Sequence, residues 1–265
     1  SSMTLIPESK QSREQLRKSP LDVTVLLAGM PKVGKTTLAG SWPAETTLIV
    51  DTQNGTAFLD GEHYVTHVQD WPTFVELIDE LIATAGERGI RTVILDLADD
   101  LWRFCDVHHA GKNAVSAGAT DDYQKSLRTA KTIWATELGR LIGSGLGVWF
   151  MTHVKEKQDG KLTRYAPLLE KEALSYVQSV CEVILLAETL GVERQLHTAP
   201  TAKFEAGSRF PLPDPLPMDA KVLYRAMGET LQAGVARDLG RDEPGDTGEA
   251  VATDEPVEAG EAVAA

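Results

Sequence analysis

The sequence is poor in cysteine and aromatic residues, and it contains no long apolar run. The two cysteines, Cys105 and Cys181, are too few for a disulfide framework, so we expect a reduced, cytoplasmic protein. Aromatic residues make up only 6% of the chain, but hydrophobic residues make up 42%, which is enough for a sizeable core. No apolar stretch reaches the length of a membrane span, and the first residues lack the apolar segment of a signal peptide.

Positive charge is also scarce, and the deficit is concentrated at the C-terminal end. The net charge is −13, and residues 238–265 alone hold nine acidic residues and one basic residue, Arg241. This segment is rich in alanine, glycine and proline and has no aromatic residue, so it cannot bury enough apolar surface to offset chain entropy. We expect a disordered acidic tail that favours solubility; a mimic of nucleic acid or a docking tail for a basic partner remains an alternative.

A phosphate-binding loop is the most informative feature of the chain. It fits the pattern G-x-x-x-x-G-K-[ST] and comprises Gly29, Met30, Pro31, Lys32, Val33, Gly34, Lys35, Thr36 and Thr37. An apolar run at 23–28 predicts a buried strand before it, and the residues from Lys35 onward can begin a helix. In this arrangement backbone amides surround a β-phosphate, Lys35 reaches the β- and γ-phosphates, and the Thr36 hydroxyl ligates Mg²⁺. The loop therefore predicts binding of ATP with Mg²⁺.

Asp96 is the second candidate metal ligand. It ends an apolar strand expected at 91–96, where a buried carboxylate needs a cationic partner, and Mg²⁺ would be adequate. The alternative is a cap on the following helix. Asp99 and Asp100 could also cap that helix or join the metal shell, and capping is the role we expect for them. Many ring ATPases carry a glutamate that acts as the catalytic base directly after this aspartate. Here that position is Leu97, which cannot act as a base.

Polar residues follow the strand expected at 147–152. Thr152 and His153 would lie beside the γ-phosphate, and His153 could sense its presence. A hairpin is expected at 155–164 around Asp159-Gly160. Its basic residues could form a solvated face, reach the phosphate of a neighbouring subunit or contact nucleic acid; they are Lys155, Lys157, Lys161 and Arg164.

Strands alternate with helices along the first 150 residues, which predicts an α/β fold with a mainly parallel sheet. A further strand is expected at 46–51, and helices at 71–85, 101–110 and 121–141. After the hairpin we expect a helix at 171–180, strands at 182–187, 194–198 and 202–205, and a last helix at 219–235. The expected organisation is a flexible arm at 1–19, an ATPase domain at 20–237 and the tail at 238–265.

The ordered set of the phosphate loop, Leu48–Asp51, Thr92–Asp96 and Phe150–His153 resembles the RecA-like P-loop ATPases. More narrowly, residues 20–235 resemble the phage-encoded RecA-like ATPases associated with single-strand annealing and recombination. The resemblance implies an oligomer that binds single-stranded DNA. Candidate DNA contacts are the hairpin and a loop at 111–125 that carries Lys112, Tyr123 and Lys125.

The chain departs from the RecA-like pattern at Gln53. That family has a glutamate there which polarises the attacking water, whereas an amide can orient water but cannot accept its proton. Hydrolysis is therefore expected to be slow, unless another carboxylate such as Asp51 serves as the base. The predicted catalytic residues are Lys35, Gln53, Asp96 and His153.

Three other functions are weighed against a recombination ATPase. A partition-type switch ATPase is disfavoured because Met30 stands where such proteins carry a signature lysine. A helicase loader of the AAA+ type is disfavoured because strands, not a helical lid, are expected after Thr152. A protein that binds nucleotide without turning it over remains open because of Gln53.

Overall fold

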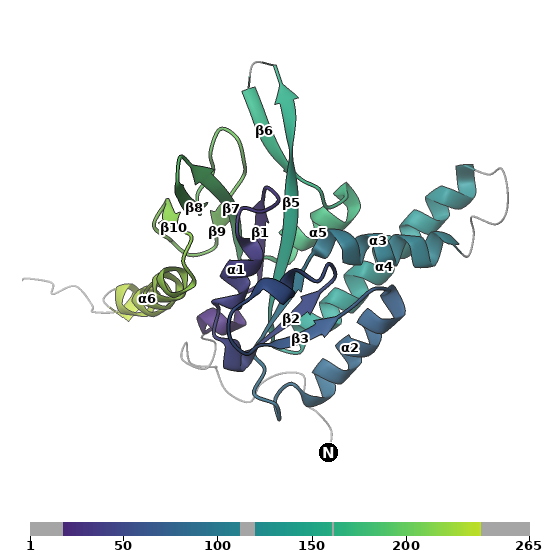
Figure 1. Cartoon of the computed structure of the whole chain (residues 1–265), viewed down its shortest axis with the longest axis horizontal. Helices are drawn as coiled ribbons and strands as arrows, with labels where there is room; N and C mark the ends of the chain where they lie inside the picture. Colours follow the sequence, from purple (N-terminus) through teal and green to yellow (C-terminus); the bar gives the residue numbers. More distant parts are fainter. Residues whose placement is uncertain (1–17, 112–119, 161, 240–265) are drawn as a thin grey trace, which may run out of the picture.

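The structure, a computed structural model, describes residues 18–111, 120–160 and 162–239, and these residues form a ten-stranded mixed sheet flanked by helices (Figure 1). The N-terminal arm to residue 17, the tail from residue 240, Lys112 and Lys161 lie outside the described residues. The strands are β1 (Val25–Gly29), β2 (Thr47–Asp51), β3 (Tyr64–His67), β4 (Thr92–Asp96), β5 (Gly147–Asp159), β6 (Leu162–Pro167), β7 (Val183–Leu190), β8 (Glu193–His197), β9 (Gly207–Ser208) and β10 (Leu216–Pro217).

The centre of the sheet is parallel, as the alternation of strands and helices predicts. The strand order is β10-β8-β7-β1-β5-β4-β2-β3, in which every pair from β7 to β3 is parallel. Strand β5 therefore lies between β1, which leads into the phosphate loop, and β4, which ends in Asp96. Because parallel strands end at the same edge, this order gathers Gly29, Asp51, Asp96 and His153 at one edge of the sheet.

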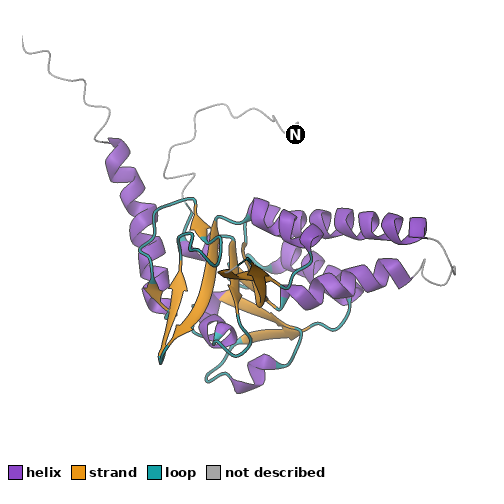
Figure 2. Ribbon diagram, turned by 90° about the horizontal axis from the view of Figure 1, so that it is seen from above, coloured by secondary structure: helices purple, strands orange, loops and turns teal. Residues whose placement is uncertain are grey.

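Helices cover both faces of the sheet (Figure 2). The longer helices are α1 (Lys35–Gly40), α2 (Trp71–Thr84), α3 (Ala98–Gly111), α4 (Thr120–Gly143), α5 (Lys171–Val180) and α6 (Ala220–Leu239), and short 3₁₀ helices are η1 (Pro20–Asp22), η2 (Ala44–Thr46) and η3 (Gly55–Phe58). Alternate residues of β1 enter opposite cores: Leu26 packs with α2, α3, α4 and α5, and Leu27 packs with α1 and α6. Within the described ranges, no helix is long and apolar enough to cross a membrane.

Three of the segments that differ from the sequence predictions bear on the site or the sheet. Strand β5 continues without a break into the predicted hairpin, where it pairs with β6. Strand β3 was not predicted, because its four residues are only partly buried and form no apolar run. The strand predicted at 202–205 is wrong: the Thr201 hydroxyl accepts hydrogen bonds from the amides of Lys203 and Phe204, which folds this segment into a turn.

The hairpin of β5 and β6 rises from the edge of the sheet that carries the strand ends (Figure 1). Its register places Lys157 directly opposite Arg164, and Lys155 lies two residues earlier on the same face. The other face carries Tyr165, whose hydroxyl lies 3.5 Å from the Glu188 carboxylate on β7. One face of the hairpin is thus basic, and the opposite face contacts the body of the protein.

Candidate functional site

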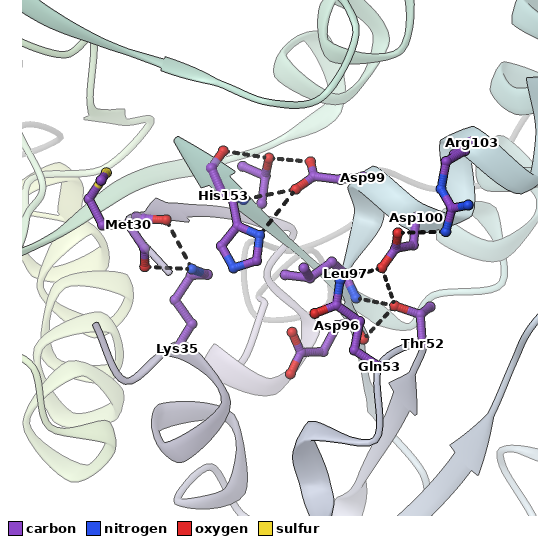
Figure 3. Close-up of polar contacts among 12 residues, drawn as sticks. Met30, Lys35, Thr52, Gln53, Asp96, Leu97, Asp99, Asp100, Arg103 and His153 are labelled. Atoms are coloured by element: carbon purple, nitrogen blue, oxygen red, sulfur yellow. Dashed lines mark hydrogen bonds and ion pairs between the residues drawn. The ribbon is translucent and has the colours of Figure 1, made fainter. Parts of the chain in front are cut away.

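The phosphate loop wraps around the side chain of Lys35, at the start of α1 (Figure 3). The Lys35 ammonium donates hydrogen bonds to the carbonyl oxygens of Gly29, at 2.9 Å, and Met30, at 3.0 Å. Gly34 adopts a φ of 107°, a conformation that favours glycine, as its place in the motif predicts. Gly29 is constrained differently: a Cβ there would lie 3.0 Å from the carbonyl oxygen of Ala187 on β7. Close packing on β7 thus holds the start of the loop.

Thr36 and Asp96 form a direct pair, as expected of two ligands to one cation. The Thr36 hydroxyl donates a hydrogen bond of 2.7 Å to Asp96 Oδ2. Burial raises the pKa of Asp96 to about 6, and the nearby Asp51 carboxylate contributes in the same direction. The alternative of a helix cap is wrong for Asp96, since the described contacts of its carboxylate lead to the phosphate loop and not to α3. A buried carboxylate with one hydroxyl partner is well suited to bind a cation.

Lys35 is the cation whose charge acts on these carboxylates. Its side chain is buried, and burial lowers the pKa of its ammonium to about 8, although Asp96 and Asp99 act in the opposite direction. A lysine whose charge is costly because it is buried gains most when phosphate oxygens take the place of solvent around its ammonium. Its position is therefore consistent with the predicted contact to phosphates.

Asp51, the predicted alternative base, accepts hydrogen bonds from the turn that follows it. Its Oδ1 accepts from the amides of Gln53 and Gly55, and its Oδ2 accepts from both the amide and the hydroxyl of Thr56. Burial tends to raise the pKa of Asp51, but the hydrogen bonds from Thr56, Gln53 and Gly55 together hold it below its usual range. A carboxylate with four donors and a lowered pKa is a poor proton acceptor, so Asp51 shapes the turn that presents Gln53.

Gln53 is oriented by a residue of α3. Its Nε2 donates a hydrogen bond of 2.7 Å to Asp100 Oδ2, which also lies 3.0 Å from the Thr52 hydroxyl (Figure 3). The other oxygen of Asp100 accepts from Arg103 at 3.0 Å. Because Nε2 is held by the carboxylate, Gln53 Oε1 is the end of the amide left to accept a hydrogen bond. Capping, the predicted role of Asp100, is therefore wrong.

Asp99 joins α3 to the end of β5. Its carboxylate accepts hydrogen bonds from the Thr152 hydroxyl and, at 2.9 Å, from the His153 amide. The capping role predicted for Asp99 is therefore also wrong, because its partners lie on β5 and not in its own helix. His153 Nδ1 lies 3.9 Å from Asp99 Oδ2, and burial together with the Lys35 charge lowers the pKa of His153 to about 4. His153 is accordingly neutral at physiological pH.

The phosphate loop, Gln53, Asp96 and His153 line a pocket of about 230 Å³. The pocket brings together Lys35, Thr36, Gln53, Asp96 and His153, which the sequence predicted to act together. Of the predicted loop residues, Lys32, Gly34 and Thr37 also line it, whereas Met30, Pro31 and Val33 face a neighbouring hollow beside the hairpin. The side chains of Tyr123 and Lys125, proposed as DNA contacts, lie outside the described part of the chain.

Arg194 is a lining residue that sequence reasoning missed. It lies on β8, 160 residues after Gly34, and its guanidinium Nη1 is 2.9 Å from the position that a Cβ on Gly34 would occupy. The sequence predicted a strand from Arg194, but the pairing of that strand through β7 to β1 was not predicted, so nothing connected this arginine with the loop.

The chain is also similar to a known protein family. Residues 21–210 match a family model described as an AAA domain. No curated protein matches the chain. The matched segment begins just before β1 and includes the loop, Asp96 and Arg194, so the whole pocket lies within it. With the mainly parallel sheet and its covering helices, this match confirms the predicted α/β P-loop NTPase fold.

Proposed function

We propose that this chain, which belongs to the AAA-domain family of P-loop ATPases, binds ATP with Mg²⁺, hydrolyses it slowly and acts on single-stranded DNA in recombination. The observation that carries the nucleotide proposal is the 2.7 Å contact between Thr36 and Asp96 next to the buried ammonium of Lys35. It places a hydroxyl, a carboxylate and a cation around the same side of a phosphate loop, which is the set that a metal-bound triphosphate needs.

The residues present fit Mg²⁺. Thr36 and Asp96 would hold it directly or through water, and Mg²⁺ characteristically takes few protein ligands and completes its shell with water and phosphate oxygens. No cluster of three or more acidic, histidine or cysteine side chains suited to a metal occurs in the described ranges. When bound, the ion would neutralise charge on the β- and γ-phosphates.

For hydrolysis, Gln53 is the residue that would orient water. Asp100 holds its Nε2, so Oε1 can accept a hydrogen bond from a water molecule at the γ-phosphate. Neither Gln53 nor Asp51 can take up the proton effectively, since one is an amide and the other is bound by four donors. We therefore expect turnover that is real but slow. His153, neutral and anchored through Asp99, would sense the γ-phosphate from the end of β5.

Phosphate release tests this proposal. The purified chain should release phosphate from ATP with Mg²⁺, and Lys35→Ala should remove both the release and the heat of ATP binding measured by calorimetry. Arg88→Ala is a suitable control, because it changes an exposed cation on the far side of the fold that pairs with Glu80. Equal release by the wild type and Lys35→Ala would contradict the proposal.

The basic face of the hairpin supports DNA as the partner. Lys157 and Arg164 stand directly opposite each other, although like charges in such a pair destabilise a hairpin. Lys155 extends this face toward the phosphate pocket. An anionic polymer that contacts Lys155 and Lys157 is the partner chemistry that such a face favours. Because the chain as a whole is acidic, binding would depend on this local patch.

Binding to a fluorescent single-stranded oligonucleotide at low salt tests the DNA proposal. The double variant Lys155→Glu/Lys157→Glu should weaken binding strongly and flatten its salt dependence, whereas Lys131→Glu, an exposed change of the same charge on α4, should not. Particle size with ATP and the oligonucleotide tests the proposed homo-oligomer. No binding by the wild type at low salt would remove the DNA part and leave the nucleotide part intact.

A second candidate is a nucleotide-binding switch or scaffold without turnover. Two observations favour it: the residue in the position of the base is the amide Gln53, and the nearby Asp51 carboxylate is fully hydrogen-bonded. Calorimetric binding of ATP together with phosphate release no faster than that of Lys35→Ala would select this candidate.

A further inference from the structure

Arg194 occupies an unusual place for a charged side chain. Its guanidinium lies against Gly34, in the phosphate loop, and lines both the phosphate pocket and an adjoining pocket of about 320 Å³. Within the described ranges, its side chain forms no ion pair and no hydrogen bond. Its position is therefore not explained by a structural contact.

The backbone of β8 fixes the direction of this side chain. Arg194 lies opposite Thr189 of β7, and its carbonyl oxygen accepts a hydrogen bond of 3.0 Å from the Met218 amide. Two residues further along the strand, Leu196 is fully buried in the core that contains α1 and α6. Because side chains two residues apart share a face of the sheet, Arg194 extends to the same side and reaches the start of α1.

Arg194 stands on a particular side of the pocket. The adjoining pocket shares Gly34, Thr37 and Arg194 with the phosphate pocket, but it includes none of Gln53, Asp96 or His153. The latter residues surround the expected position of the γ-phosphate, so Arg194 lies at the opposite end, where the nucleoside would leave the loop. A guanidinium there can form two parallel hydrogen bonds to phosphate oxygens, and it stays charged at all relevant pH values.

We infer that Arg194 binds the phosphates that ATP and ADP share, from within the same subunit, and so clamps the nucleotide across the loop from Lys35. The inference rests on the proposed binding of nucleotide. It adds to the phosphate site an arginine that comes from the same chain as the phosphate loop, so no neighbouring subunit has to supply it. It also predicts that Arg194 contributes to holding the nucleotide and not to distinguishing ATP from ADP.

Calorimetric titration of ATP and ADP, each with Mg²⁺, tests the inference on the full chain. Arg194→Ala should weaken binding of both nucleotides by the same factor, about 10- to 100-fold, since charge-assisted hydrogen bonds are lost. Arg194→Lys should restore part of the affinity, because a point charge replaces a bidentate group. Arg225→Ala removes the same group from a position on α6 outside the phosphate pocket and should bind like the wild type.

Each other outcome is decisive. Binding by Arg194→Ala within about twofold of the wild type would overturn the inference while leaving the proposed function intact. Loss of affinity for ATP with unchanged affinity for ADP would overturn it too, because the contact would then be with the γ-phosphate. A wild-type chain that binds neither nucleotide would overturn the proposed function, and the inference with it. Thermal unfolding of Arg194→Ala should match that of the wild type, since the exposed side chain forms no ion pair or hydrogen bond with the described residues.

Discussion

Replacing Gln53 with the glutamate of the RecA-like pattern should not by itself produce a fast ATPase. The Gln53 amide donates to Asp100 Oδ2 at 2.7 Å, so the variant Gln53→Glu would bring two carboxylates together at the same place. The new side chain would lose its hydrogen bond and meet a like charge. We expect it to rotate away from the pocket or to remain protonated.

The size of this repulsion follows from the geometry. Two unit charges about 4 Å apart repel by roughly 1 kcal/mol in bulk water and by roughly 4 kcal/mol at an effective dielectric constant near 20. Arg103, 3.0 Å from the other oxygen of Asp100, offsets part of this. A net penalty of about 2 kcal/mol would leave roughly one molecule in thirty with the new carboxylate in position. That loss would cancel much of the gain of about 100-fold or more that a positioned base can supply.

The matched double variant separates the two effects. In Gln53→Glu/Asp100→Asn the asparagine can donate to the new carboxylate, so the geometry of the wild-type pair is restored with donor and acceptor exchanged. Phosphate release should stay within about fivefold of the wild type in Gln53→Glu and rise by about 100-fold or more in the double variant. Asp100→Asn alone is the control and should change little. A single variant as fast as the double variant would refute this reasoning.

Two further predictions concern Asp96 and His153. Chelation of Mg²⁺ should weaken ATP binding by the wild type but have little further effect on Asp96→Asn, as measured by calorimetry; a variant that keeps the full Mg²⁺ dependence would exclude Asp96 as a ligand. For His153, burial lowers the folded-state pKa from its ordinary value of 6.5 to about 4, so the unfolded chain takes up the proton first as the pH falls. The contribution of His153 to stability should therefore be lost between pH 6.5 and pH 4, while Asp96, whose raised pKa is about 6, acts in the opposite direction over the same range. Urea unfolding should isolate the His153 contribution as a difference between the wild type and His153→Gln that changes across this pH range; a difference that does not change with pH would contradict the lowered pKa of His153.

The sequence predicted the strands and helices whose burial is reflected in a local apolar pattern. Apolar runs predicted β1, β2 and β4 because these strands are buried on both faces, and the helix expected at 171–180 is α5 at its observed bounds. Strand β3 exists because its backbone pairs with β2 at the sheet edge, and its side chains give little sign of this. Phe204 shows the reverse: it is buried, but in a turn stabilised by Thr201.

The candidate site was predictable only in part, for a similar reason. The phosphate loop and Asp96 are identified by residue type and by their place after a strand, which are local features. Asp99 and Asp100 follow a strand and begin a helix, so local chemistry favours a cap. Their actual partners, Thr152 and Gln53, are 53 and 47 residues away and come within reach only through the strand order. The position of Arg194 beside the phosphate loop depends on the same strand order.

The strand order also has a consequence for how the site and the hairpin relate. Asp99 and Asp100 are consecutive residues in the first turn of α3; one holds the end of β5 and the other holds Gln53. The first turn of α3 therefore joins the residue that would orient water to the end of the strand that carries His153. Because β5 continues unbroken from His153 to Asp159, the residue that Asp99 holds is joined to the base of the hairpin by one continuous strand and not by a loop.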